Sequence, residues 1–225
     1  MTFGFRNKRR AFELFVVLGI HAFSTHAAYG AGREVATLSG SAAYVIPAAN
    51  TGKSYDGFLA ALRKMESGGN YKAVNTLNFI GAYQFGEAAL IDLGYVRRDR
   101  DPYDNNYGGG FTGKNGIRSI DDFLNNRAVQ DKAAKAWMKI MWKYIEADGL
   151  RRYAWRKVGD VQMTPSGMLA AAHLLGSGAL KDYIRANGQS DFRDPYGTPL
   201  SKYINTLAGY DVPFGPSKPA VVASL

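Results

Sequence analysis

The sequence predicts a mainly α-helical single domain, and three observations support this fold class. Apolar residues recur at helical spacing through most of the chain after residue 54. Ser and Thr residues stand where they would cap these helices. The chain has 225 residues, enough for one sizeable domain, and its 46% hydrophobic and 21% charged residues are ordinary for a soluble globular protein.

The N-terminal residues have the layout of a cleavable secretory signal. Basic residues lie between Arg6 and Arg10, an apolar run extends from Leu14 to Phe23, and small residues begin at Ala27. The apolar run is too short to span a bilayer as a stable helix. We therefore expect a signal peptide over residues 1–30, cleaved near residues 27–30. An amphipathic helix of the mature domain is the alternative, and the sequence does not distinguish Sec from Tat export.

This leader predicts a periplasmic or secreted protein, and the absence of cysteine excludes a lipid anchor at the cleavage site, so no stable membrane anchor is expected. Because the chain has no cysteine, thiolate metal sites are excluded as well. Of the three histidines, His21 and His26 lie in the leader, which leaves too few for a histidine-based metal centre.

The formal net charge of +9 favours a polyanionic partner. Nucleic acid, anionic lipid and acidic cell-wall polymer all fit that charge. The sequence contains no zinc-finger spacing and no RNP-like aromatic motif, so we expect no nucleic-acid partner.

The mature chain divides into a linker over residues 31–53, a helical domain over 54–212 and a flexible tail over 213–225. Gly, Ser and Ala residues predict the linker, which has room for one strand, and Pro and Ser residues predict a loose tail. A Gly- and Tyr-rich segment over 95–116 predicts a long loop, and loops of that length are usually functional or disordered. Caps and periodicity predict helices over 55–66, 87–93, 119–124, 127–147, 164–175, 177–186 and 198–207.

Glutamate is scarce, and Glu66 occupies the position that best suits an acid catalyst. It follows Leu62 by four residues and Leu59 by seven, so it lies on the apolar face of its helix. A carboxyl in such a place is partly desolvated, which raises its pKa and lets it protonate a glycosidic oxygen. A helix-end glutamate in a salt bridge is the alternative. The remaining glutamates lie in the leader, the linker or at helix ends: Glu13, Glu34, Glu87 and Glu146.

The residues around Glu66 resemble the lytic transglycosylase family of lysozyme-like enzymes. That family carries a Glu-Ser motif, a Gly-Leu-Met-Gln type motif, a third motif reading Ala-Ala-Tyr-Asn-Ala-Gly-Pro-Gly, and a Tyr after a short polar lead-in. The corresponding segments occur here in the same order and span most of the mature chain: Glu66-Ser67, Gly81-Ala82-Tyr83-Gln84, Ala171 to Gly178, and Leu200 to Ile204 with Tyr203.

The resemblance implies a lysozyme-like fold in which Glu66 is the catalytic residue and the other matched positions bind substrate. Ser67 would orient the Glu66 carboxylate, with a local cap bond as its alternative role. Gln84 would hydrogen-bond the sugar. Tyr83, where the family has Met, would stack on a sugar face or fill core. Gly176 and Tyr203 complete the implied substrate site.

Two positions depart from the family pattern. His173 stands where the family has Tyr, and Leu174 where it has an Asn that helps to hold the substrate. We include His173 among the implied substrate-binding residues, although its flanking Ala and Leu residues favour a satisfied core histidine.

The resemblance further implies cleavage of peptidoglycan glycan strands between N-acetylmuramic acid and N-acetylglucosamine. One glutamate acts as acid and then as base, giving a 1,6-anhydro product with no metal and no cofactor. Two alternatives stay open: a hydrolytic muramidase, and a non-catalytic glycan-binding scaffold of a secretion or conjugation apparatus. A hydrolase needs a second carboxylate or a positioned water, and its candidates are Asp92, Asp99, Asp101 and Asp104.

Overall fold

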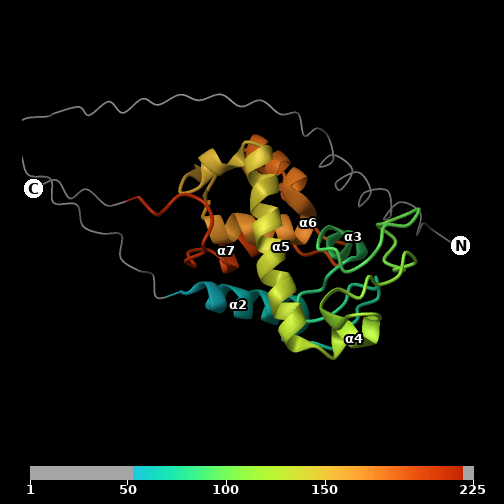
Figure 1. The fold of residues 1–225 in the computed structure, drawn as a ribbon. Coiled ribbons are helices and arrows are strands. Elements are labelled where there is room, and N and C mark those ends of the chain that lie inside the picture. Colours follow the sequence, from blue (N-terminus) through green and yellow to red (C-terminus); the bar gives the residue numbers. More distant parts are fainter. Residues whose placement is uncertain (1–52, 220–225) are drawn as a thin grey trace, which may run out of the picture.

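Helix α5 (Arg127–Ala147) runs through the middle of the structure, and the other helices lie around it (Figure 1). The computed structural model describes residues 53–219, so the predicted signal peptide, nearly all of the linker and residues 220–225 lie outside the described residues. The fold is mainly α, as predicted. The other elements are α2 (Tyr55–Ser67), α3 (Glu87–Asp92), α4 (Ile120–Leu124), α6 (Pro165–Arg185), α7 (Leu200–Thr206), 3-10 turns at Lys114–Gly116 and Leu150–Tyr153, and strands β1 (Lys157–Val158) and β2 (Val161–Gln162).

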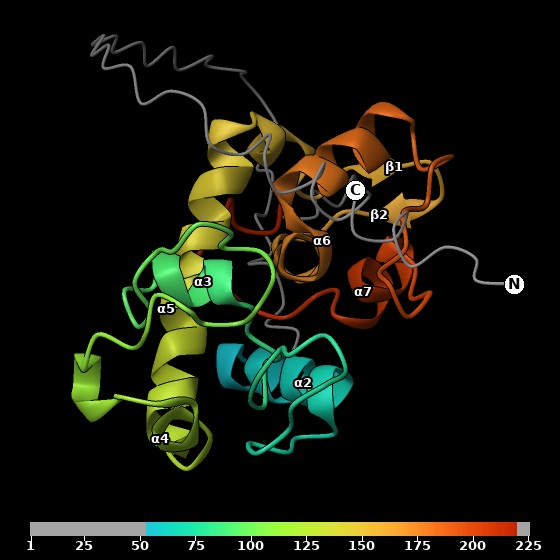
Figure 2. The same cartoon turned by 90° about the vertical axis from the view of Figure 1, so that its right-hand side faces the viewer.

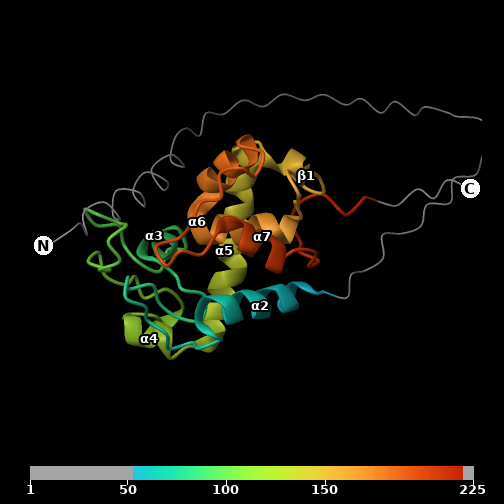
Figure 3. The ribbon, with the colours of Figure 1, turned by 180° about the vertical axis from the view of Figure 1, so that it is seen from behind.

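The core forms where α6 packs against both α5 and α7. Figure 3 shows α2 crossing below these helices. The apolar faces predicted from helical spacing point inward: Phe58 and Leu62 of α2, Met138 of α5, Leu169 of α6 and Ile204 of α7 are all fully buried. The apolar spacing of α2 therefore directs the C-terminal end of that helix, which carries Glu66, toward the interior.

Most helix boundaries follow from local capping, and the predicted ranges agree closely with the structure. Ser54, Ser119 and Thr164 each accept a hydrogen bond from the backbone of the first helical turn. The range predicted for α5 is correct at both ends. The last helix begins at Leu200, later than predicted, because Pro199 is its N-cap.

The β-hairpin and the two 3-10 turns were not predicted. Strands β1 and β2 form a two-stranded antiparallel hairpin joined by Gly159-Asp160 (Figure 2). Gly-Asp between β-branched residues is a recognised signal for a two-residue hairpin turn. Gly159 has φ 55°, the left-handed conformation that such turns require.

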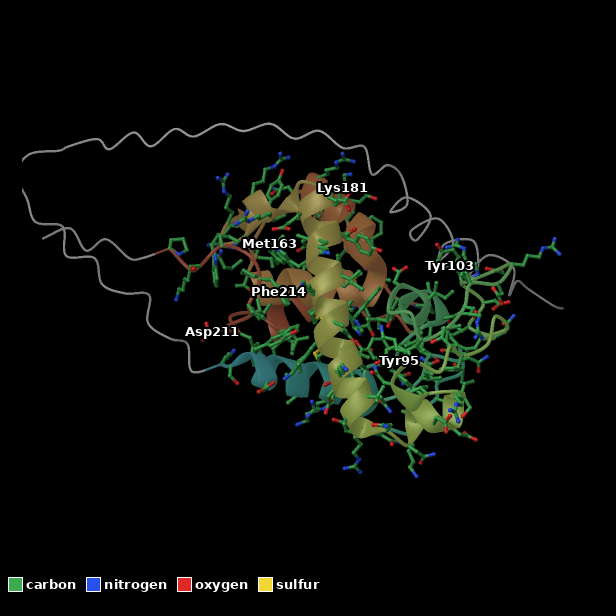
Figure 4. All side chains as sticks on the ribbon, in the orientation of Figure 1. Tyr95, Tyr103, Met163, Lys181, Asp211 and Phe214 are labelled. Carbon is green, nitrogen blue, oxygen red and sulfur yellow. The ribbon has the colours of Figure 1, made fainter. Side chains whose placement is uncertain are left out.

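The predicted flexible tail begins too early in the sequence. Phe214 packs edge-on against Tyr55 of α2, with ring centroids 6.0 Å apart, and Trp155 donates a hydrogen bond to the carbonyl of Pro216 at 2.8 Å. Figure 4, in which Phe214 and Asp211 are labelled, shows this segment beside the helices. Residues 213–216 therefore belong to the domain, since the Phe214 ring packs against its core and the Pro216 carbonyl is held by Trp155.

Among residues 53–219, no helix combines the length and apolar character that crossing a membrane requires.

Candidate functional site

Glu66 lies in the last turn of α2, with only 11% of its side chain exposed. The helix ends one residue later, and Gly68 is its C-cap. One carboxyl oxygen, Oε1, is buried and has no hydrogen-bond partner in the part of the chain that the structure describes. A carboxylate in such a place has lost its water without gaining an equivalent set of donors.

The electrostatic surroundings of Glu66 favour the protonated acid. Burial raises the pKa of Glu66, a hydrogen bond from Tyr203 lowers it, and the negative charge of Asp194 raises it; together they bring the pKa to about 8. The carboxyl is therefore mainly neutral at pH 7 and can donate a proton. This agrees with the partial desolvation that the apolar face of α2 predicted.

His173, on α6, has a defined protonation state. The indole Nε1–H of Trp137 donates to His173 Nδ1 at 3.1 Å, and an indole nitrogen is only a donor. The other ring nitrogen, Nε2, lies 3.0 Å from the carbonyl oxygen of Tyr83, which is only an acceptor. Nδ1 must therefore carry the lone pair and Nε2 the proton. The imidazole is neutral, and burial lowers its pKa to about 4.

The same Nε2 lies 3.5 Å from Oε1 of Glu66. Because His173 is neutral, this is not an ion pair, and the distance exceeds that of a normal N–H···O hydrogen bond. The 6% exposure of the His173 side chain leaves little of the ring for a substrate to contact. His173 is thus a satisfied buried histidine, one of the two roles expected for it, and its contact is with the candidate acid.

Tyr203 and Asp194 complete the surroundings of Glu66. Tyr203, on α7, is 5% exposed and forms a hydrogen bond with the Glu66 carboxyl; burial and the charge on Glu66 both raise the pKa of its phenol. Asp194 lies in the turn before α7, where its Oδ1 accepts hydrogen bonds from the backbone of Tyr196 and Thr198. The structure therefore brings Tyr203, a predicted site residue, to Glu66, together with a carboxylate that was not predicted.

The segment over residues 81–84 is held rigidly beside α2. A Cβ on Gly81 would lie 2.3 Å from Oε1 of Gln130, so only glycine fits there. The buried Gln130 accepts a hydrogen bond from the backbone N–H of Ala82 at 2.8 Å and donates to the carbonyl of Phe123 at 2.8 Å. These contacts fix the carbonyl of Tyr83 where His173 reaches it.

Ser67 and Gln84 are both engaged with this segment. The Ser67 hydroxyl donates to the carbonyl of Ala82 at 2.9 Å and lies 3.3 Å from that of Arg63, so the predicted bond to the Glu66 carboxylate is not formed. Ser67 fastens the end of α2 to the segment instead. The side-chain amide nitrogen of Gln84 donates a hydrogen bond to the carbonyl of Gly81 at 2.8 Å, and its side-chain oxygen takes no part in this bond.

Tyr83 is a core residue, and its predicted stacking on a sugar face disagrees with the structure. Its ring is fully buried. Its hydroxyl donates to Oδ1 of Asp131 at 2.7 Å and accepts from Nη1 of Arg63 at 3.0 Å. A side chain enclosed in this way has no face available to a ligand.

Gly176 separates the two helical segments that the sequence predicted on either side of it. Its φ of 81° and ψ of 164° interrupt α6, and a Cβ there would meet nothing within 4 Å. The positive φ therefore explains why this residue is glycine, whereas crowding by neighbouring atoms does not.

The carboxylate that raises the pKa of Glu66 is Asp194, which is not among the aspartates predicted as a second carboxylate. Asp92 accepts a hydrogen bond from the Tyr144 hydroxyl at 2.9 Å, and Asp99 and Asp104 lie together beside Glu87. Asp194 had no signal in the sequence, because its proximity depends on the packing of a turn 128 residues after Glu66 (194 − 66).

Comparisons with protein-family models, with curated proteins and with solved structures found no match to this chain.

Proposed function

We propose that this protein is a lysozyme-like enzyme of the lytic transglycosylase type, which cleaves the glycan strands of peptidoglycan in the periplasm or outside the cell. The observation that carries the proposal is the buried Glu66 carboxyl with its pKa raised to about 8. The ordered motifs from Glu66 to Tyr203 support the substrate class, and the mainly α fold agrees with it.

The proposed reaction needs one carboxyl. Protonated Glu66 donates to the oxygen that links C1 of N-acetylmuramic acid to N-acetylglucosamine, and the C1–O bond breaks. The resulting carboxylate takes the proton of the muramic 6-hydroxyl, whose oxygen bonds to C1. Tyr203 stabilises the carboxylate between these steps, since its hydroxyl donates to the ionised form. Atoms balance without water, and Glu66 ends protonated.

A hydrolytic muramidase is the second candidate, and Asp194 favours it. An inverting or retaining hydrolase uses a second carboxylate near the acid, and Asp194 is close enough to raise the pKa of Glu66. In that mechanism Asp194 would activate water or stabilise the positive charge at C1. The two candidates give different products from the same bond.

Digestion of purified peptidoglycan followed by mass spectrometry tests the proposal. A transglycosylase gives fragments ending in 1,6-anhydromuramic acid, each lighter by one water than the hydrolytic product. Glu66→Gln should abolish release of either product, because the amide cannot donate the proton; losses at catalytic acids commonly reach about 10²–10⁴-fold.

The matched control is Glu146→Gln, a change at a glutamate of α5 that is 43% exposed and lies outside the site. It should retain wild-type release. Hydrolytic products alone would favour the muramidase, and a Glu66→Gln variant as active as wild type would contradict both enzymes. Pelleting of the variant with peptidoglycan, without any cleavage by the wild type, would instead indicate a glycan-binding scaffold.

A further inference from the structure

The long Gly- and Tyr-rich loop brings three carboxylates together away from Glu66. Glu87 at the start of α3 and Asp99 and Asp104 of the loop each present one oxygen, and these oxygens all lie within 4.8 Å of one another. Glu87 is fully buried, Asp99 is half-buried and Asp104 is exposed. The cluster lies in the region of α3 and the adjoining loop, where Tyr103 is labelled in Figure 4.

No protein cation neutralises this cluster. None of the ion pairs formed within residues 53–219 includes Glu87, Asp99 or Asp104. Two arginines precede Asp99 in the sequence but act elsewhere: Arg97 donates to the carbonyl of Phe111 at 2.9 Å. The positive charge of Arg98 acts on Asp92, where it partly offsets the burial that raises the pKa of that carboxyl. Three carboxylates this close repel one another strongly unless a positive charge lies between them.

A second observation points to a missing ligand. Oε2 of Glu87 accepts a hydrogen bond from the backbone N–H of Tyr107 at 2.9 Å, but Oε1 is buried and has no hydrogen-bond partner among residues 53–219. A buried carboxylate oxygen without a donor is costly, and such groups are normally paired or coordinate a metal. We propose that Glu87, Asp99 and Asp104 bind a calcium ion.

The ligand set identifies the class of metal. All three side chains offer hard oxygen donors, which suit Ca²⁺ or Mg²⁺ rather than zinc or copper. Ligands on opposite sides of one calcium ion lie about 5 Å apart, against about 4 Å for magnesium. The three oxygens lie within 4.8 Å of one another, so one calcium ion can reach all of them. Magnesium in proteins is usually held by one or two carboxylates, whereas this cluster offers three. Calcium takes six to eight oxygens in flexible geometry, so waters and further chain oxygens would complete its shell.

The ion would brace the loop against the rest of the domain. Asn105, next to Asp104, accepts from the backbone N–H of Glu87 at 2.8 Å and donates to the carbonyl of Leu77 at 2.9 Å. The Tyr107 hydroxyl donates to the carbonyl of Asn78 at 2.8 Å and lies 3.1 Å from that of Phe85. Calcium bound here would stabilise the loop around residues 105–107 and the residues 77–87 that it contacts. This structural role does not depend on the proposed function.

The test is calcium binding by the full chain after removal of metals with a chelator. Isothermal titration with calcium chloride should show one site with Kd below about 1 mM. Saturating calcium should raise Tm by about 5 °C, because only the folded chain holds the three carboxylates together. Magnesium at the same concentration should raise Tm less.

Three isosteric variants show whether calcium binds at the cluster or to acidic residues of the loop in general. Asp99→Asn and Asp104→Asn should each weaken calcium binding by about tenfold or more, since each removes one ligand charge. Asp101→Asn is the matched control: it lies in the same loop, is exposed, and is not part of the cluster. It should bind within about twofold of wild type.

The two aspartates are the informative positions because Glu87 is fully buried, and circular dichroism checks that the aspartate variants fold. Absence of both heat and a Tm shift at about 10 mM calcium would overturn the proposal. Equal weakening by Asp101→Asn would also overturn it, because the binding would then be diffuse. An equal response to magnesium would overturn the assignment to calcium.

Discussion

His173 Nε2 donates its proton to the carbonyl of Tyr83 at 3.0 Å while lying 3.5 Å from Oε1 of Glu66. Trp137 occupies the other ring nitrogen, so the imidazole cannot gain a second proton without turning two N–H groups toward each other. His173 is neutral above about pH 4 and Glu66 is neutral below about pH 8. Between these limits the acid faces an uncharged ring, which leaves its proton available for transfer.

Replacing His173 with Phe should destabilise the fold by about 2–4 kcal/mol at pH 7, because Trp137 Nε1–H and the Tyr83 carbonyl lose their partner. The penalty should shrink toward acid. The folded pKa of His173 lies below its unfolded value of 6.5, so the wild-type histidine loses stability as pH falls from about 6.5 to about 4, by roughly 3 kcal/mol. Urea unfolding across this range measures the difference.

Tyr95→Phe is the control for that series. It removes a buried hydroxyl that accepts from Asn115 at 2.7 Å and leaves the imidazole intact. Its cost should not vary between about pH 7 and pH 4. A His173→Phe penalty that stays constant over the same range would contradict a neutral buried imidazole.

Replacing Glu66 with Gln should stabilise the fold increasingly as pH rises. The folded pKa of Glu66 lies above its unfolded value, so the unfolded chain releases the proton first and wild-type stability falls between about pH 4.5 and pH 8. The gap between Glu66→Gln and wild type should widen by about 5 kcal/mol over that window and stay level above it. Denaturant titrations of both proteins, with Glu146→Gln beside them, check this; parallel curves would show that Glu66 titrates normally.

Replacing Asp194 with Asn should lower the pKa of Glu66, because the negative charge of Asp194 raises it. Asn keeps an oxygen for the N–H groups of Tyr196 and Thr198. For a transglycosylase, the alkaline limb of activity should move down from about pH 8 by less than about one unit, with anhydro products unchanged. Asp160→Asn, at the exposed hairpin turn, should not move it.

The same variant separates the two enzymatic candidates. In a hydrolase that uses Asp194, activity should fall by about 10²-fold or more at every pH. Activity profiles and product masses from one set of digests therefore give both readouts.

Replacing Tyr83 with Phe should lower the free energy of unfolding by about 1–3 kcal/mol and leave KM within about twofold of wild type. The hydroxyl is bonded to Asp131 and Arg63 inside the core, where no substrate reaches it. Thermal unfolding and initial rates on peptidoglycan measure the two effects. Gln84→Ala serves for comparison: it removes a part-buried side chain that is predicted to hydrogen-bond the sugar, so KM should rise. A raised KM in Tyr83→Phe would restore the sugar-stacking role.

The helices could be predicted because the interactions that define them are local. Capping bonds at Ser54 and Thr164 join residues three positions apart, and the apolar stripe on α2 repeats within two turns. The hairpin at Gly159 was also encoded locally, in a Gly-Asp pair between two valines. The docking of Phe214 on Tyr55 had no local signal, because the two residues lie near opposite ends of the domain's sequence.

For the site, the sequence by itself determined that Glu66 lies on an apolar helical face, which is enough to predict a desolvated acid. Only the tertiary structure decided what surrounds it: neutral His173 held by Trp137, Tyr203 as hydrogen-bond partner, Asp194 as a nearby charge, and Tyr83 enclosed in the core. The same holds for Glu87, whose place in a first helical turn was evident and whose burial beside Asp99 and Asp104 was not. Burial and proximity arise from packing between segments remote in sequence, and no spacing along the chain records them.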